Sequence, residues 1–301
     1  MDVSYEELKR REWLSPFGGD DVRGCLNRLS PAASKAAAGL VQTGRSFDLT
    51  ATLDWPDPPI YGRKAVKQTV FDNEFSRDDY LDDYHPQLSS QWDALRHVKD
   101  AASGHFFNRK EEEELGTDTW PPIVTRGILA DVAGHAAAKG RPIDWRDNYE
   151  ISLVELEECL QEAEITPQMG DVLLIRTGWE TGYRGASDQV KRELADTPNP
   201  DLRTPGLQPS EELAARLWDW GLVAVAADNP SLEVWPPPAA EPDVMHFKML
   251  GRMGMPIGEL FWLEDLARYC AEVGRHSFLF TSAVLKLHGL CGTPPNAIAV
   301  L

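Results

Sequence analysis

The segment Gln87–His97 limits most strongly how this chain folds, because it holds two amides, a carboxylate and an imidazole within eleven residues. A regular helix would put Gln87 and Gln91 on one face and turn Asp93 and His97 about 240° and 280° away from Gln87, at roughly 100° per residue. A straight strand would align all four but spread them over about 33 Å. The segment must therefore bend if these side chains are to converge on one site.

Two polar residues far downstream are candidates for the same site. His246 lies in the apolar run His-Phe-Lys-Met-Leu, where a lone histidine is usually a satisfied core or boundary residue. Glu259 follows it by thirteen residues. Glu241 and Asp243 are nearer to His246 and are alternative ligands, although their proline-rich setting is more typical of a surface turn. With the segment above, His246 and Glu259 indicate a metal-hydrolase site.

Composition favours one soluble globular domain over residues 1–301, with 42% hydrophobic residues and no internal repeat. The formal net charge of −18 argues against electrostatic binding of nucleic acid, because a surface with this charge repels phosphates. An anionic substrate would need local help from an arginine or a metal ion. We therefore expect a small-molecule substrate.

Four cysteines are widely spaced and form no C-x2-C pair, so we expect reduced core residues: Cys25, Cys159, Cys270 and Cys291. The N-terminal residues 1–11 are charged, and no run of eighteen apolar residues occurs anywhere. Membrane insertion and secretion therefore lack a signal, and we expect a cytoplasmic protein.

Helices and short strands alternate along the chain, which predicts an α/β or α+β fold. Ser30-Pro31 and Ser152 have the sequence of helix N-caps, and Gly274 that of a helix stop. Apolar periodicity and turn residues predict helices over 31–40, 152–164, 210–220 and 263–273, and strands over 45–50, 172–175, 222–227, 277–287 and 297–301.

Residues 54–108 show little periodicity, which is typical of a functional loop in a compact domain. Trp55, Tyr61, Phe71 and Trp92 either wall a pocket for a planar ring or pack in the core. The charged run Lys110–Glu114 is expected to be a solvated loop or helix face.

The spacing Q-x3-Q-x-D-x3-H of the bending segment resembles the metal-dependent cyclase family, which includes bacterial kynurenine formamidases and isatin hydrolases. The more common pattern there is H-x3-H-x-D-x3-H. The glutamine version is similar to the branch that contains trans-dienelactone hydrolases. The resemblance extends to further blocks in the same order: Gly24–Asn27, Gly170–Trp179, Asp228–Ser231, His246–Leu250, Gly254–Glu259 and Gly292–Ala297.

This resemblance implies a swivelling β/β/α domain of layered sheets with packed helices. It also implies a first metal position held by Gln87, Gln91 and Asp93, and a second in which Asp93 bridges to His246 and Glu259. His97 would be the acid/base, and Glu259 would also belong to the catalytic set. His85 and His105 flank the segment and are rival acid/base groups.

Amide oxygens are harder and weaker ligands than imidazole nitrogens, so oxygen-rich ligands favour Mn²⁺, Mg²⁺ or Ca²⁺ over zinc. The dienelactone hydrolase branch, however, is regarded as zinc-dependent. We expect one firmly bound divalent ion, zinc or manganese, with the second position weak or empty. The alternative is that the glutamines orient substrate or water without touching metal. Arg96 would meet a substrate carboxylate, or form a surface or interface ion pair.

The leading hypothesis is a metal-dependent hydrolase that uses metal-activated water on a lactone first, and on an arylformamide or cyclic amide second. Two alternatives stay open. One is a non-catalytic small-molecule-binding protein with a degenerate metal site, and the other is a metal-dependent cyclase or lyase. By analogy with the family, we expect a homodimer or homotetramer.

Overall fold

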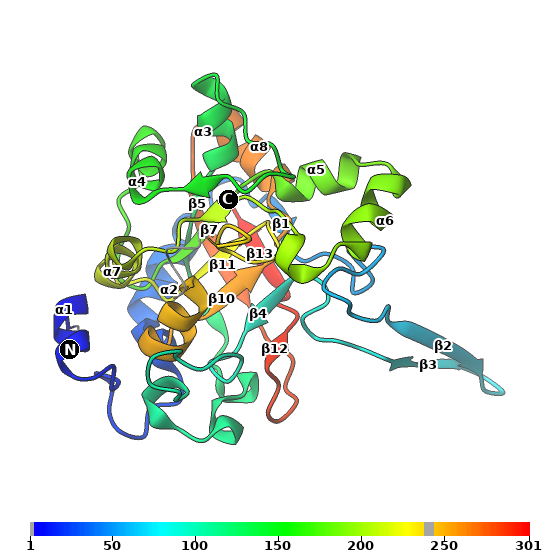
Figure 1. The fold of residues 1–301 in the computed structure, drawn as a ribbon, viewed down its shortest axis with the longest axis horizontal. Helices are drawn as coiled ribbons and strands as arrows, with labels where there is room; N and C mark the ends of the chain where they lie inside the picture. The colour runs from blue at the N-terminus through cyan, green and yellow to red at the C-terminus, as the bar shows by residue number, and fades with distance from the viewer. Residues whose placement is uncertain (1–2, 238–243) are drawn as a thin grey trace.

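The computed structural model describes residues 3–237 and 244–301, and this part of the chain is built around a mixed nine-stranded sheet (Figure 1). The four central strands are parallel, and the strands on either side of them run antiparallel. The order across the sheet is β1 (Ser46–Asp48), β13 (Ala297–Val300), β11 (Ser277–Ser282), β5 (Ile123–Ala130), β7 (Val172–Ile175), β9 (Ala224–Ala227), β10 (Ile257–Glu259), β4 (Gln91–Asp93) and β12 (Gly292–Thr293).

Both faces of the central strands are buried, which explains why β7 and β9 are continuous apolar runs. Side chains alternate between faces along a strand. Leu173 and Ile175 accordingly pack in one hydrophobic core, and Val172 and Leu174 pack in the other. The sheet therefore separates two apolar layers.

Helices cover both layers. On the first face lie α1 (Tyr5–Arg10), α3 (Val132–Ala138), α4 (Leu153–Glu162), α7 (Glu211–Asp219) and a π-helix (Phe247–Met253). On the second face lies α8 (Glu264–Val273), while α2 (Pro31–Ala38) packs against β5 and β11. A third, smaller cluster joins α5 (Trp179–Gly185) to α6 (Asp188–Asp196).

Serine caps set the starts of several helices, as the sequence predicted. The hydroxyls of Ser30, Ser152 and Ser210 each accept the backbone N–H three residues later. Gly274 ends α8 in the left-handed conformation, with φ 66°. These elements confirm the α/β class and the helix and strand positions, to within a few residues.

Two local expectations were wrong. The β-rich segment over 277–287 is a strand only as far as Ser282. Cys291 is exposed, whereas Cys25, Cys159 and Cys270 are buried free thiols, as expected.

The segment 54–108 contains an exposed hairpin of β2 (Lys67–Asp72) and β3 (Arg77–Asp82), which projects from the body of the molecule (Figure 1). Every residue of both strands is exposed. The remaining short elements are the parallel pair β6 (Glu150–Ile151) and β8 (Gly206–Leu207), and 3-10 turns at Gly24–Arg28, Phe107–Arg109, Glu112–Leu115, Thr117–Thr119 and Asn199–Asp201.

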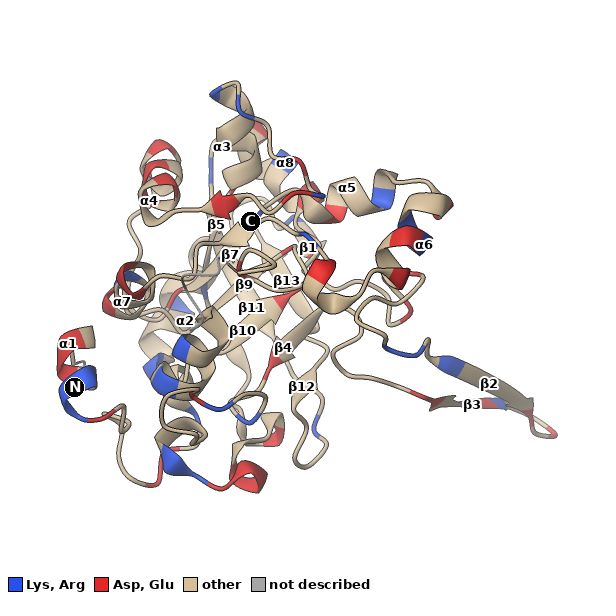
Figure 2. Ribbon diagram, viewed as in Figure 1, with Lys and Arg blue, Asp and Glu red and all other residues tan. Residues whose placement is uncertain are grey.

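Charge lies on the outer elements. Figure 2 shows acidic positions on α4, α6 and α7 and along the hairpin. In the charged run, residues 111–114 are exposed, as predicted. Within residues 3–237 and 244–301, no helix combines the length and the apolar character needed to span a membrane.

Candidate metal centre

Strand pairing places three of the candidate residues on one face of the sheet. β4 and β10 are antiparallel, with Glu259 opposite Gln91 and Ile257 opposite Asp93. Because strand side chains alternate, Gln91, Asp93 and Glu259 share a face and Trp92 points the other way. All three are at least 95% buried, with exposed fractions of 1%, 1% and 4%.

A tight turn after β4 brings His97 back over the strand. The backbone N–H of His97 donates to the carbonyl of Ala94 at 2.8 Å, which reverses the chain. Gln87 lies in a turn before β4, and its Nε2 is 2.6 Å from Oδ1 of Asp93 and 3.1 Å from Nδ1 of His97. The bend that convergence requires is therefore present, and it occurs on both sides of a three-residue strand.

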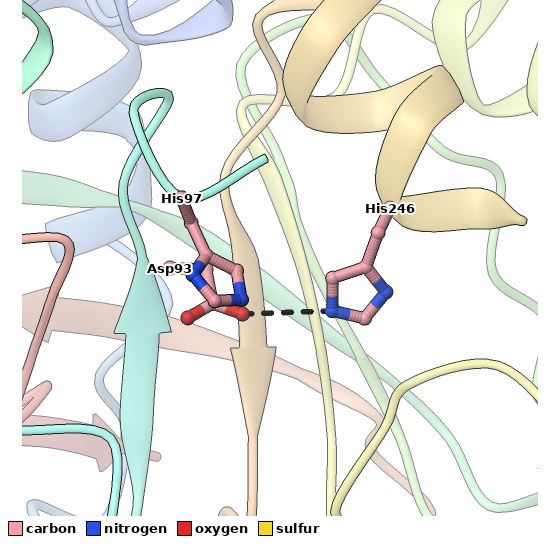
Figure 3. Close-up of side chains that lie close together, drawn as sticks. All are labelled: Asp93, His97 and His246. Carbon is pink, nitrogen blue, oxygen red and sulfur yellow. Dashed lines mark ion pairs between the residues drawn. The ribbon is translucent and has the colours of Figure 1, made fainter. Parts of the chain in front are cut away.

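The start of the π-helix carries His246 to the same place. Its Nε2 is 3.2 Å from Oε1 of Glu259 and 3.6 Å from Oδ2 of Asp93. Figure 3 shows the rings of His97 and His246 close to the Asp93 carboxylate, which a dashed line joins to His246. One ligand atom each from Asp93, His97 and His246 lies within 4.8 Å of the others. π-helical turns are often found at functional sites.

Glu233 also belongs to this cluster, although little in the sequence pointed to it. Both of its carboxylate oxygens lie 2.9 Å from Nδ1 of His246, and the residue is only 1% exposed. Histidines that bind metals commonly donate their second N–H to a carboxylate in this way. The one available signal was the stretch Asp228–Ser231, which ends two residues before Glu233.

Two buried oxygen atoms of the cluster have no hydrogen-bond partner in the part of the chain that the structure describes: Oε1 of Gln91 and Oδ2 of Asp93. Nε2 of Gln91 donates to Glu259, so its amide oxygen is the free end. Buried polar atoms are normally paired or bound to a metal ion. The donor set of carboxylate, amide and imidazole therefore fits a divalent cation.

The charges of the cluster interact strongly. Burial alone would raise the pKa of Asp93, but His97 and His246 hold it below its usual value. Burial lowers the pKa of His97, so its ring is neutral near pH 7. Burial and the charge of Asp93 raise the pKa of Glu259 to about 7. For His246, the charge of Glu233 outweighs burial and raises the pKa well above its usual value.

A cavity of about 360 Å³ opens beside these groups. His97, His246 and Glu259 reach its wall. Its lining also includes Tyr61, Arg63, Asn199, Glu233, Trp235 and Phe247. The site thus combines a polar cluster with a partly aromatic pocket, which is typical of small-molecule sites.

Several other expectations are corrected by the structure. Arg96 does not line the cavity, because its guanidinium donates to the carbonyl of Gly289 and lies 3.9 Å from Glu112. Arg63 takes the place in the cavity that the sequence suggested for Arg96. Neither His85 nor the exposed His105 lines the cavity.

Most of the aromatic candidates belong elsewhere. Trp92 is fully buried in the second core, Trp55 packs against Trp179, Tyr183 and Trp262, and Phe71 is exposed on the hairpin. Only Tyr61 of the four lines the cavity, among the residues that the structure describes. The alternative ligands Glu241 and Asp243 lie outside the described residues.

Two of the sequence blocks serve to position the site. A Cβ atom on Gly24 would lie 2.0 Å from the carbonyl oxygen of Gly254, so only glycine permits this contact between the chain start and the end of the π-helix. Asp228 accepts hydrogen bonds from the backbone N–H groups of Thr177 and Gly178, which ties the end of β9 to the end of β7.

Comparison with known proteins gives the family and the fold. A family model named Cyclase, described as "Putative cyclase", matches residues 47–234. A crystal structure of a novel cyclase is 28% identical over 95% of this chain and 96% of that one, with a TM-score of 0.79. Among proteins of curated function, none matches this chain.

More distant structures share the fold. Isatin hydrolase A from Ralstonia solanacearum is 16% identical over 90% of this chain and 96% of that one, with a TM-score of 0.63. A structure named "Potential Metal-Dependent Hydrolase With Cyclase Activity" is 19% identical over 85% of this chain and 98% of that one, with a TM-score of 0.53. Because the family model covers more than half of the sequence, the chain belongs to the Cyclase family.

Proposed function

We propose that this protein is a metal-dependent hydrolase that cleaves the acyl bond of a lactone, a cyclic amide or an arylformamide. The observation that carries the proposal is the buried cluster of Asp93, His97 and His246 beside a cavity of about 360 Å³. The names of the structural relatives support hydrolysis with a metal ion. The lactone comes first because the glutamine spacing resembles that of the dienelactone hydrolase branch.

The residues that would hold the ion are Gln87, Gln91 and Asp93 at one position, and Asp93, His246 and Glu259 at a second. Zinc or manganese suits this mixture of oxygen and nitrogen ligands. Such an ion supplies a Lewis acid, which lowers the pKa of water and polarises a carbonyl group.

The side chains around that position have separate tasks. Glu233 holds the proton of His246 at Nδ1, so Nε2 faces Asp93 and Glu259. His97 is neutral near pH 7 because burial lowers its pKa, so it can accept a proton from the attacking water and return it to the leaving oxygen or nitrogen. The aromatic rings of Tyr61 and Trp235 hold a flat substrate and exclude water from it.

The experiment that tests the proposal measures metal content and turnover together. Elemental analysis of the purified protein should find zinc or manganese near one equivalent, and the metal should be lost from Asp93→Ala. The wild type should hydrolyse phthalide or formanilide, and a chelator should stop it. If wild-type protein binds no metal even after reconstitution, the site is degenerate and the protein binds small molecules without hydrolysing them.

A further inference from the structure

Arg63 is the only lysine or arginine among the described residues that line the cavity. It precedes strand β2 of the exposed hairpin by four residues in the sequence, and its guanidinium donates to the backbone carbonyl of Gln87. The ring of Tyr61 lies 5.4 Å from its guanidinium carbon. The arginine is therefore anchored at the rim of the site, next to an aromatic wall.

This arginine does not neutralise the carboxylates around it. Glu233 and Glu259 line the same cavity, yet Arg63 forms no ion pair with any Asp or Glu that the structure describes. Glu233 pairs with His246, and Glu259 bonds to Gln91 and His246. Apart from the bond to Gln87, the guanidinium N–H groups of Arg63 have no hydrogen-bond partner in the described chain.

An unpaired guanidinium at a ligand cavity is suited to one class of group. Its planar fork of N–H donors matches a carboxylate, and its charge offsets the cost of bringing an anion near acidic residues. This protein has a formal net charge of −18, so an anionic substrate needs such a local cation. Arg63 lines the same cavity as His97 and Glu259, so the guanidinium lies beside the groups proposed to react.

We propose that Arg63 binds a carboxylate that the substrate carries in addition to the bond that is cleaved. The inference rests on the proposed hydrolase function and narrows it to anionic, flat lactones or amides. The ring lies against Tyr61 and Trp235, the carboxylate pairs with Arg63, and the scissile carbonyl points to the cluster of Asp93 and His246. Arg63 is then a specificity-determining residue.

The test compares a matched pair of substrates, phthalide and phthalide-5-carboxylate, in the wild type and in Arg63→Met. The carboxylate substrate should lose on the order of 10- to 100-fold in kcat/KM, as expected for lost charge-assisted hydrogen bonds, and phthalide should lose far less. Lys64→Met is the control, because Lys64 is exposed, adjacent, and does not line the cavity. It also removes one positive charge, and it should leave the ratio of kcat/KM for the two substrates as it is in the wild type.

Each outcome decides the inference separately from the hydrolase function. Equal losses on both substrates in Arg63→Met would mean that Arg63 only holds the Gln87 turn, and would overturn the inference while leaving hydrolysis intact. If Lys64→Met changes the ratio of kcat/KM for the two substrates as much as Arg63→Met does, the effect comes from long-range charge, and this result would also overturn the inference.

If the wild type hydrolyses neither compound, calorimetric binding of phthalide-5-carboxylate decides. Binding that weakens in Arg63→Met but not in Lys64→Met supports the inference, and binding that is the same in all three proteins refutes it.

Discussion

Glu233 and His246 form a buried pair in which both carboxylate oxygens lie 2.9 Å from the imidazole Nδ1. The pair keeps a proton on Nδ1 of His246 and turns Nε2 toward Asp93 and Glu259. The carboxylate therefore orients the imidazole, and no lysine or arginine of the described chain forms an ion pair with it.

Glu233→Gln should weaken zinc binding by about 10- to 100-fold, because an amide holds the imidazole less firmly and makes Nε2 less basic. Competition with a chromogenic chelator measures the affinity. Nitrogen chemical shifts of the His246 ring give a second measurement, since the fraction protonated at Nδ1 should fall. Unchanged affinity together with unchanged ring shifts would exclude the orienting role. Urea unfolding of the metal-free variant controls for a general loss of stability.

His97→Ala should keep the metal and lose turnover by about 100- to 10,000-fold, the usual contribution of a general acid/base. His97 lies within the same 4.8 Å group of ligand atoms as Asp93 and His246, so the metal content of the variant separates the two roles. If the ion is lost along with activity, His97 is a ligand. His105→Ala is the matched control, because His105 is exposed and does not line the cavity.

Asp228→Asn should change how stability depends on pH. Burial raises the pKa of Asp228 to about 6, although Thr177 donates two hydrogen bonds to it. In the unfolded chain this pKa is about 3.9. The folded state then binds the proton more tightly, so Asp228 makes the protein less stable as pH rises from about 4 to about 6, by about 3 kcal/mol in total.

The asparagine variant lacks this titration. The difference in unfolding free energy, wild type minus variant, should therefore fall by about 2 kcal/mol between pH 4 and pH 7. Urea unfolding at the two pH values measures it. Parallel pH profiles for the two proteins would show that Asp228 is ionised throughout this range.

Part of the fold and site could be predicted from sequence because local patterns determine it. The cap at Ser152 and the apolar run Val172–Ile175 depend on neighbouring residues, and both elements lie where the sequence placed them. The bend around Asp93 followed from geometry alone, since no regular element brings Gln87 and His97 together.

The rest depends on contacts between distant segments. Glu233 and Arg63 look like ordinary surface charges in the sequence, and only the folded chain brings one to His246 and the other to the cavity. For Trp92 the sequence left a pocket wall and core packing open. The structure supports core packing, because side chains alternate along β4 and Trp92 points away from its two neighbours in the site.

Gly258→Ala should damage the site through packing alone. Gly258 pairs with Trp92 in the sheet, and a Cβ atom there would lie 2.4 Å from Cβ of Ala226 and 2.8 Å from Cζ3 of Trp92. Strand β10 would have to move away from its neighbours, which costs about 1 to 3 kcal/mol of stability. Glu259 is the next residue, so its carboxylate would shift relative to Asp93 and metal affinity should fall as well.

Gly185→Ala is the control for the glycine substitution itself, because a Cβ atom on Gly185 meets nothing within 4 Å. This variant should bind metal like the wild type and match or exceed its stability. Chelator competition and urea unfolding on both variants measure the two effects. If Gly258→Ala loses stability but binds metal as the wild type does, the pairing of β10 with β4 is not what sets the distance between Glu259 and Asp93.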